Sequence, residues 1–399
     1  MKVRTLLVAL LVAVFTISGA VMAQEEEETV TLPNVGLVTG AGEGEATALT
    51  GTGASFPSAL IAIWLDLYVP MTGVDVNYQP TGSSAGIRSI LDGSVDFGGT
   101  EAALSDEQVE SAPATVLHIP VTLGGVVPTY NIPELSADVQ LKFTPENLAL
   151  AFLGEAGRTA DRDPLLKWND PRLVADNPEL AEIDRYIVIV RRAEGSGTTD
   201  IFTNYLSTVN EDWAELVGRG TSVNWPTGIG ARGSAGVAGN VAQTPYSLTY
   251  VEKAFAGLND LPFAAVQNAE GNFVVASQET ISNAAAQFEI PDDLRVELVN
   301  APGADSYPIV GMTWILVYQD QTDAELAGAL SRFLWWATHD GQQLVIDESD
   351  DLIIAGYAPL PEPVIRLAEA QILSINVDGE TALAADIIEA SDLQEAAAE

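Results

Sequence analysis

Short apolar runs alternate with amphipathic helical patterns along most of this chain, and this alternation restricts the fold more than any other feature of the sequence. The run YIVIVRR, which ends at Arg192, has the character of a buried strand, and DIFTNYLSTV shortly after it has the spacing of a helix. VDVNYQ, AGIRSILDG and VDFGGT repeat this order. The alternation predicts an α/β protein with largely parallel sheets. Open sheets of that class bind ligands at the carboxyl ends of their strands, beside helix N-termini.

The chain of 399 residues is long enough for two lobes of ordinary size between two atypical ends. Residues 1–23 contain two basic residues, an apolar run and then small residues, which predicts a secretory signal peptide. The apolar run is short for a membrane span, so an uncleaved anchor is the second interpretation. Residues 24–48 are acidic and rich in glycine and predict a flexible leader, and 378–399 predict a C-terminal tail, either a short helix or disordered.

Composition excludes several classes of function. With 17 basic and 56 acidic residues the net charge is -39, which argues against binding to nucleic acid or to anionic membranes. The chain has no cysteine, so a disulfide framework, a thiolate nucleophile and a lipid-modified cysteine are all excluded. Its only histidines are His118, expected in a strand, and His339, expected at a helix end. The carboxylates lack calcium-loop spacing, and we expect no metal and no cofactor.

Three predicted helices are each preceded by a short segment of glycine and hydroxyl residues, which we call the entrance of the helix. LTGTGASFPSALIAIWLDLY contains Ser55 as the expected N-cap, NYQPTGSSAGIRSILDG contains Ser83, and RRAEGSGTTDIFTNYLS contains Ser196. A helix N-terminus has unpaired N–H groups and the positive end of the helix dipole, which suit an anion. Arg192, just ahead of the third entrance, could add a forked, charged pair of donors. The alternative interpretation is that each entrance is an ordinary helix cap.

These entrances, together with IPVTLGGVVPTYNIPEL and VNWPTGIGARGSAGVAGNV, resemble the PstS family, the secreted phosphate-binding proteins of the high-affinity phosphate ABC transporter. The resemblance runs from about Leu49 to about Leu373. It implies a class II periplasmic-binding-protein fold, in which two α/β lobes joined by crossing strands close over one phosphate. Lobe I would comprise 49–125 plus 307–377, and lobe II would comprise 126–306.

The resemblance also implies a phosphate site with donors from both lobes. By motif position its residues are the Ser55 hydroxyl, the Phe56 backbone N–H, Ser83 and Glu101 in the first lobe, and Arg192, Ser196, Gly197 and Thr198 in the second. The chain departs from the family in two places, because Glu101 and Glu194 stand where the family commonly has aspartate. Both changes keep the charge and lengthen the side chain by one methylene.

Glu101 is the predicted residue with the clearest physical consequence. A carboxylate in an anion site lowers affinity unless the ligand donates a hydrogen bond to it. Phosphate near neutral pH carries at least one proton and sulfate carries none, so a buried acceptor would favour phosphate. The alternative is that Glu101 points to solvent and that Ser105 or water supplies the acceptor. Glu194 is expected to orient Arg192 rather than to touch the ligand.

Other functions remain open at the level of the sequence. GSSAG, from Gly82 to Gly86, also fits the nucleophile elbow of a serine hydrolase, with Ser84 as nucleophile and a histidine as its partner. Binding of sulfate, molybdate or a phosphorylated small molecule is a nearer alternative, and a surface adhesin or phosphate sensor is a third. We expect a monomeric binding protein that catalyses no reaction and delivers phosphate to ABC permease subunits from the periplasm or the outer cell surface.

Overall fold

The computed structural model describes residues 32, 34–136, 139–346 and 356–398, and the residues from Leu32 onward form one compact unit. The predicted signal peptide, 1–23, lies outside the described residues. Within the described ranges, none of the helices combines the length and the apolar character that a membrane span requires.

The central sheet is mixed, with two parallel blocks joined by antiparallel strands. Its strands, in spatial order, are β2 (Asp75–Gln79), β1 (Ala48–Gly53), β3 (Phe97–Thr100), β11 (Val310–Tyr318), β4 (Val116–Asn131), β8 (Ser247–Glu252), β6 (Val188–Arg192) and β7 (Ile229–Ala231). The pairs β2–β1, β1–β3, β8–β6 and β6–β7 are parallel, and the pairs that β11 and β4 make are antiparallel. We call the part built on β2, β1 and β3 the first lobe and the part built on β8, β6 and β7 the second lobe.

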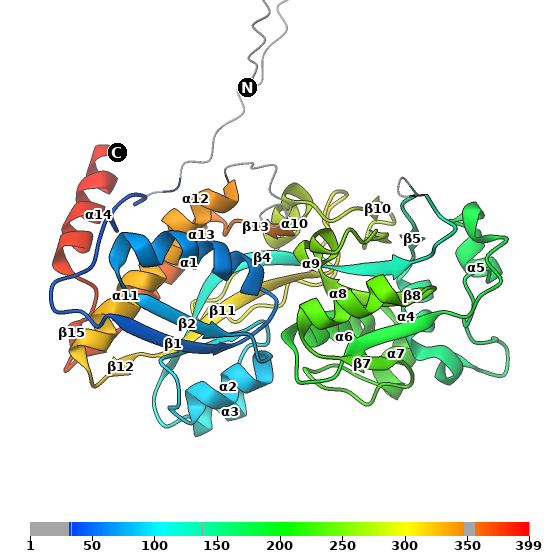
Figure 1. The fold of residues 1–399 in the computed structure, drawn as a ribbon, viewed down its shortest axis with the longest axis horizontal. Coiled ribbons are helices and arrows are strands. Elements are labelled where there is room, and N and C mark those ends of the chain that lie inside the picture. Colours follow the sequence, from blue (N-terminus) through cyan, green and yellow to red (C-terminus); the bar gives the residue numbers. More distant parts are fainter. Residues whose placement is uncertain (1–31, 33, 137–138, 347–355, 399) are drawn as a thin grey trace, which may run out of the picture. The chain divides into compact units, whose positions relative to one another are not determined.

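Strand β4 belongs to both lobes (Figure 1). It pairs with β11 as far as Gly125 and with β8 from Val126 onward. Its run VLHIPVTLGGVVPTY is buried throughout, as expected of a strand covered on both faces. The predicted α/β class and two-lobe fold are confirmed. The pairing of β4 changes at the predicted crossing point, and the lobe boundaries themselves stay a prediction.

Helices surround both parallel blocks, and short strands complete the fold (Figure 1). Those from the two ends of the chain are α1 (Ser58–Thr72), α2 (Ser83–Leu91), α3 (Asp106–Ser111), α11 (Ala324–Thr338), α12 (Asp340–Ile346), α13 (Glu362–Ser374) and α14 (Ala385–Ala398). Those from its middle are α4 (Pro145–Leu153), α5 (Pro171–Val174), α6 (Gly197–Val209), α7 (Glu211–Leu216), α8 (Gly233–Gln243), α9 (Lys253–Leu258), α10 (Gln278–Ala285) and the 3₁₀ turns η1 (Gly154–Gly157) and η2 (Pro178–Leu180). The short strands are β13 (Tyr357–Ala358) on β4, the set β5 (Lys142–Phe143), β9 (Ala265–Gln267) and β10 (Phe273–Val274), and the set β12 (Asp320–Gln321), β14 (Asn376–Val377) and β15 (Glu380–Thr381).

Each lobe has aromatic packing of its own. In the first lobe Tyr68 of α1 packs edge-on against Phe333 of α11, with ring centroids 5.2 Å apart. In the second lobe Phe202 of α6 stacks on Tyr250 of β8 at 4.4 Å. Burial of such rings is a large hydrophobic contribution to stability. The buried hydrophobic residues of both lobes nevertheless belong to one continuous cluster, so these aromatic contacts are local parts of a shared core.

The segment AELAGALSRFLWWATHDGQQLV, 324–345, has apolar residues at helical spacing throughout, which predicts one long helix, but it forms two. Helix α11 ends at Thr338, and His339 leaves the helical conformation with φ -124° and ψ -86°. The His339 ring nitrogen Nδ1 lies 2.7 Å from the carbonyl oxygen of Trp335, and Nε2 lies 2.8 Å from the carboxylate of Glu369. His339 therefore lies at a helix end, as predicted, and its buried ring holds the junction between α11 and α12.

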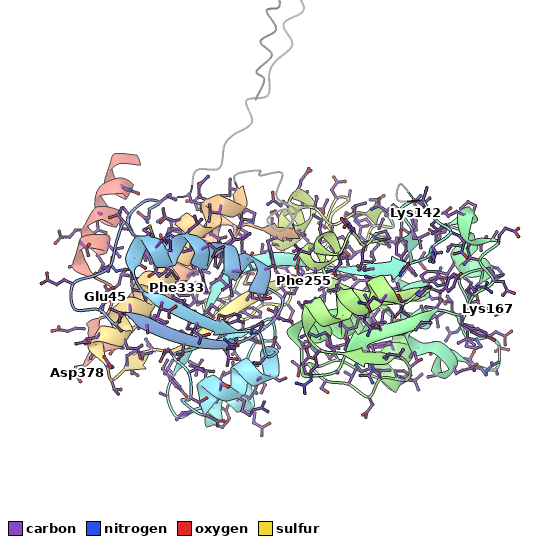
Figure 2. The ribbon with its side chains drawn as sticks, in the orientation of Figure 1. Glu45, Lys142, Lys167, Phe255, Phe333 and Asp378 are labelled. Carbon is purple, nitrogen blue, oxygen red and sulfur yellow. The ribbon has the colours of Figure 1, made fainter. Side chains whose placement is uncertain are left out.

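The predicted leader contacts the fold along part of its length. Val38 is buried, and the Glu45 carboxylate accepts hydrogen bonds from the Arg332 guanidinium at 2.8 Å. Arg332 precedes Phe333 on α11, and Figure 2 shows Glu45 and Phe333 in the same part of the molecule. Both charged groups are almost entirely buried, at 4% exposure for Arg332 and 9% for Glu45.

Removing this partner should destabilise the protein. We expect Glu45→Ala to lower the free energy of unfolding by about 3 kcal/mol, because it leaves a buried guanidinium without its main counter-ion. Urea unfolding followed by circular dichroism measures the change. Glu43→Ala is the matched control, since Glu43 is an exposed acid in the same segment. Equal unfolding midpoints for the two variants would show that residues near Glu45 do not contribute to the fold.

Candidate functional site

The candidate site lies where parallel strands of both lobes end. In the first lobe β1 ends at Gly53, shortly before Ser55, and β3 ends at Thr100, directly before Glu101. In the second lobe β6 ends at Arg192 itself. This is the expected position for ligands in an open α/β sheet, because the helix N-termini that follow the strands also point there.

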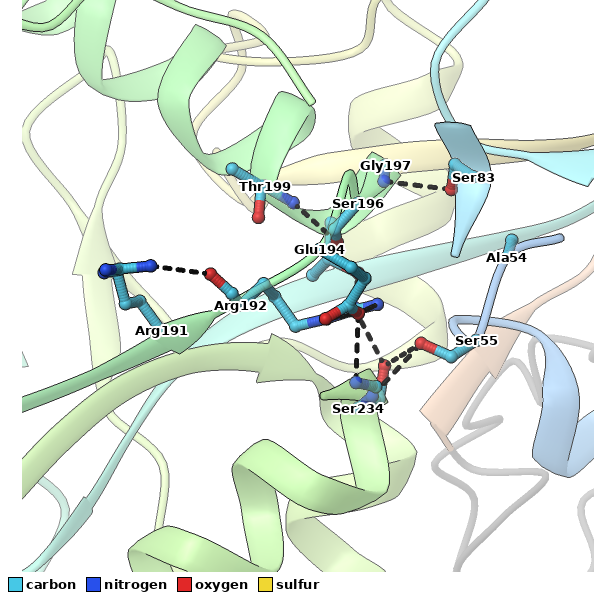
Figure 3. Close-up of polar contacts among 12 residues, drawn as sticks. Ala54, Ser55, Ser83, Arg191, Arg192, Glu194, Ser196, Gly197, Thr199 and Ser234 are labelled. Carbon is cyan, nitrogen blue, oxygen red and sulfur yellow. Dashed lines mark hydrogen bonds and ion pairs between the residues drawn. The ribbon is translucent and has the colours of Figure 1, made fainter. Parts of the chain in front are cut away.

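Hydrogen bonds join the two lobes at this place (Figure 3). The Gly197 N–H of α6 donates to Ser83 Oγ of α2 at 2.9 Å. The Ser234 N–H of α8 donates to Ser55 Oγ at 3.1 Å, and the two serine oxygens are 3.0 Å apart. The three helix entrances that the sequence singled out therefore lie together.

The Glu101 carboxylate is buried between these contacts, with 4% of the residue exposed. Its Oε2 accepts from Ser83 Oγ at 3.0 Å, and its Oε1 accepts from Thr313 Oγ1 of β11 at 3.2 Å. Burial raises the pKa of Glu101 to about 7, and the hydrogen bond from Ser83 acts in the opposite direction. Glu101 thus points into the site and not into solvent, against the alternative interpretation of this residue.

Arg192 contacts residues from three segments of the second lobe. Its Nε donates to Glu194 Oε1 at 2.6 Å, and its Nη2 forms an ion pair with the same oxygen. Its Nη1 donates to Thr198 Oγ1 at 3.2 Å and lies 3.5 Å from Ser234 Oγ. Glu194 Oε1 also accepts from the Gly233 N–H at 3.0 Å. The carboxylate of Glu194 therefore holds the guanidinium plane, and its contacts are those of a residue that orients Arg192.

The start of α6 leaves no room for a side chain at Gly197. A Cβ there would lie 2.4 Å from Glu101 Oε2 and 2.7 Å from Ser83 Oγ. Ser196 is the N-cap of α6, and its hydroxyl accepts from the Thr199 N–H at 3.2 Å. The entrance consequently combines ordinary capping by Ser196 with close approach of the backbone to the opposite lobe at Gly197.

The first entrance differs from the prediction. Helix α1 begins at Ser58 with Pro57 as its N-cap residue, so the prediction that Ser55 caps this helix is wrong. Pro57 takes helical angles of φ -83° and ψ 0°, which moves the cap two residues along the chain. The Ser55 hydroxyl is thereby released from capping and contacts α8. The neighbouring Phe56 is fully buried, and its carbonyl accepts from the Tyr357 hydroxyl at 2.7 Å.

Two residues of the site were missed from the sequence. Ser234 is fully buried at the start of α8, and Thr313 is fully buried in β11. A signal for Ser234 was present, since GARGSAG has the same glycine and serine pattern ahead of a helix as the other entrances. Thr313 carries no local signal, because only the pairing of β11 with β3 brings it opposite Glu101.

The arrangement does not favour a hydrolase. Ser84 Oγ donates to Thr221 Oγ1 at 3.0 Å. His118 Nε2 accepts from the Leu104 N–H at 3.2 Å, and burial lowers the pKa of His118 to about 4. His339 bonds to Glu369, as described above. In the part of the chain that the structure describes, no group of three or more acidic or histidine side chains could hold a metal ion.

Comparison with known sequences and structures is consistent with this geometry. Residues 39–340 match the PBP superfamily domain. The phosphate-binding protein PstS of Pasteurella multocida is 40% identical over 329 residues, which cover 82% of this chain and 90% of that protein. The PstS protein of Methanocaldococcus jannaschii is 35% identical over 340 residues, covering 79% and 83% respectively.

Solved structures share the fold at lower identity. A high-affinity periplasmic phosphate-binding protein, PfluDING, bound with phosphate, superposes with a TM-score of 0.62 at 20% identity, covering 84% of this chain and 96% of that one. A phosphate-binding protein from Stenotrophomonas maltophilia superposes with a TM-score of 0.56 at 20% identity, covering 82% and 94%. With the sequence matches, these findings show that the chain belongs to the PstS family of phosphate-binding proteins.

Proposed function

We propose that this protein captures inorganic phosphate between its two lobes, outside the cytoplasmic membrane, and delivers it to the permease of an ABC transporter. The observation that carries the proposal is the meeting of Ser83, Gly197 and the buried Glu101 at the contact between the lobes. The names of the related proteins support the same ligand.

The proposed ligands are those predicted from the sequence. They are the hydroxyls of Ser55, Ser83, Ser196 and Thr198, the backbone N–H groups at Phe56 and Gly197, the guanidinium of Arg192 and the carboxylate of Glu101. Charge-assisted hydrogen bonds contribute about 1.5–3 kcal/mol each, so several of them outweigh the repulsion of an acidic surface. A ligand that contacts both lobes at once stabilises the closed form over the open form.

Glu101 supplies the discrimination between oxyanions. When it is ionised the carboxylate can only accept hydrogen bonds, so it favours a ligand that carries a proton. Phosphate satisfies this requirement and sulfate does not. Because the site is buried, sulfate would meet an unpaired like charge with little screening by solvent. Molybdate is disfavoured by the same argument.

Transport rather than catalysis is the role that these residues support. The related proteins are named as binding proteins, and the described contacts of Ser84 do not include a histidine. We propose that the protein is a monomer that is exported through its N-terminal segment. We expect no lipid anchor on a cysteine, because the given sequence contains no cysteine.

Glu101→Gln should relax the selectivity for phosphate. The glutamine amide can donate to sulfate, and it removes the negative charge that repels it. We expect sulfate binding to become measurable by calorimetry, and phosphate binding to weaken by about 10- to 100-fold through loss of one charge-assisted hydrogen bond. Selectivity equal to that of the unmodified protein would contradict the role of Glu101.

Selectivity should also depend on pH. Above pH 7 Glu101 is mostly ionised and accepts only, whereas below its pKa of about 7 it is protonated and can donate to sulfate. Competition of sulfate against labelled phosphate is therefore expected to be stronger at pH 5.5 than at pH 8.5, the two values being about 1.5 units either side of that pKa. The Glu101→Gln variant is the control and should show a weaker pH dependence of sulfate binding. A pH-independent competition in the unmodified protein would contradict the account.

The neighbouring serines of GSSAG provide a matched pair. Ser83→Ala removes a proposed ligand and should weaken phosphate binding by about 10-fold. Ser84→Ala removes only the contact with Thr221. The affinity for phosphate should therefore change by less than about 2-fold, which is the smallest effect expected of a neutral hydrogen bond. A chromogenic phosphomonoester tests the hydrolase alternative in parallel. Turnover that Ser84→Ala abolishes would establish that alternative instead.

A further inference from the structure

We propose that Ser234 is a positioning residue of the phosphate site, which aligns the Ser55 hydroxyl toward the ligand when the lobes close. The proposal rests on the function proposed above, and it adds a residue that neither the motifs nor the family resemblance assigned. It concerns a contact between lobes, because Ser234 begins α8 of the second lobe and Ser55 follows β1 of the first.

Ser234 contacts Ser55 through two of its polar groups. Its backbone N–H donates to Ser55 Oγ at 3.1 Å, and its own Oγ lies 3.0 Å from the same oxygen. Ser234 is fully buried and Ser55 is 5% exposed, so solvent cannot easily substitute for either bond. A buried serine with two bonds from one neighbour has a fixed position for its hydroxyl oxygen.

Arg192 lies beside the hydrogen bond between the two hydroxyls, in which either oxygen can be the donor. A guanidinium has donors only, and its Nη1 lies 3.5 Å from Ser234 Oγ, which therefore accepts from it. If the Ser55 hydroxyl donates to an oxyanion, its oxygen can accept from the Ser234 hydroxyl, which has no other acceptor among the described contacts. Among the contacts of the described residues, the Ser55 hydroxyl has no carbonyl or carboxylate to which it donates. Its one acceptor among them is Ser234 Oγ, and in the proposed complex an oxyanion takes the place of that acceptor.

The start of α8 is itself held by the binding machinery. The Gly233 N–H donates to Glu194 Oε1 at 3.0 Å, and the same oxygen accepts from Arg192 Nε. The position of Ser234 therefore follows the orientation of Arg192 through Glu194. Figure 3 shows this chain of contacts running from Arg192 and Glu194 through Ser234 to Ser55. A change in Arg192 on ligand binding would be passed to the first lobe by this route.

A double-mutant cycle on phosphate affinity tests the proposal. The dissociation constant is measured by calorimetry for the unmodified protein, Ser234→Ala, Ser55→Ala and the double variant. We expect Ser234→Ala to weaken binding by about 3- to 10-fold, the range for a neutral hydrogen bond. Because Ser234 acts through Ser55, adding Ser234→Ala to Ser55→Ala should change the affinity by less than about 2-fold.

A buried serine elsewhere in the lobe controls for general destabilisation. Ser247 is fully buried, and its hydroxyl donates to the Thr244 carbonyl at 2.6 Å, just beyond the other end of α8. Ser247→Ala should lower Tm without changing phosphate affinity, whereas Ser234→Ala should change the affinity. If Ser234→Ala does not fold, Ser234→Cys, whose S–H is a weaker donor, replaces it in the cycle.

The outcomes separate this proposal from the proposed function. Absence of phosphate binding by the unmodified protein would overturn both. Phosphate binding with an unchanged affinity in Ser234→Ala would overturn only the role of Ser234. Losses that multiply in the double variant would show that Ser234 acts independently of Ser55, and would also overturn it. A loss in Ser234→Ala that disappears in the Ser55→Ala background supports it.

Discussion

A single buried carboxylate, that of Glu101, is the constraint on which the candidate site depends. Taking an isolated charge out of water is costly, and hydrogen bonds from Ser83 and Thr313 offset only part of that cost. The raised pKa of Glu101 reflects the part of the desolvation cost that these two hydrogen bonds do not offset. A partner that brings its own proton removes this cost, because it donates to the carboxylate. In the proposed site, affinity and selectivity for protonated phosphate would therefore have the same origin.

The architecture supplies the donors that surround this carboxylate. Strands β1, β3 and β6 end beside site residues, and the starts of α2, α6 and α8 contribute contacts there. Strand β4 runs through both lobes and pairs with β11 in the first and with β8 in the second. Small residues make the approach close, since a side chain at Gly197 would collide with Glu101. In the proposed function, binding and closure would thus involve the same residues.

Local sequence patterns predicted the α/β class and the three helix entrances, whereas the two-lobe fold and the choice of Glu101 as a site residue came from the resemblance to the PstS family. Alternating strands and helices were recognisable from periodicity, and the glycine and hydroxyl pattern identified the entrances that hold Ser83 and Ser196. Ser55 was wrongly expected to cap a helix, because a serine shortly before proline has that pattern while the backbone at Pro57 decides where the helix starts. Thr313 could not be found, since its place opposite Glu101 depends on which strands pair. Ser234 had the right pattern, but its importance lies in a contact with the other lobe.

A crystal structure with bound phosphate is the most direct test of the central claim. The account predicts one phosphate between the lobes, with an oxygen within hydrogen-bonding distance of a Glu101 carboxylate oxygen. It also predicts that other oxygens of the same phosphate contact Ser55, Ser83 and Arg192. Phosphate bound outside the space between the lobes, or between them with Glu101 turned away from it, would contradict the account.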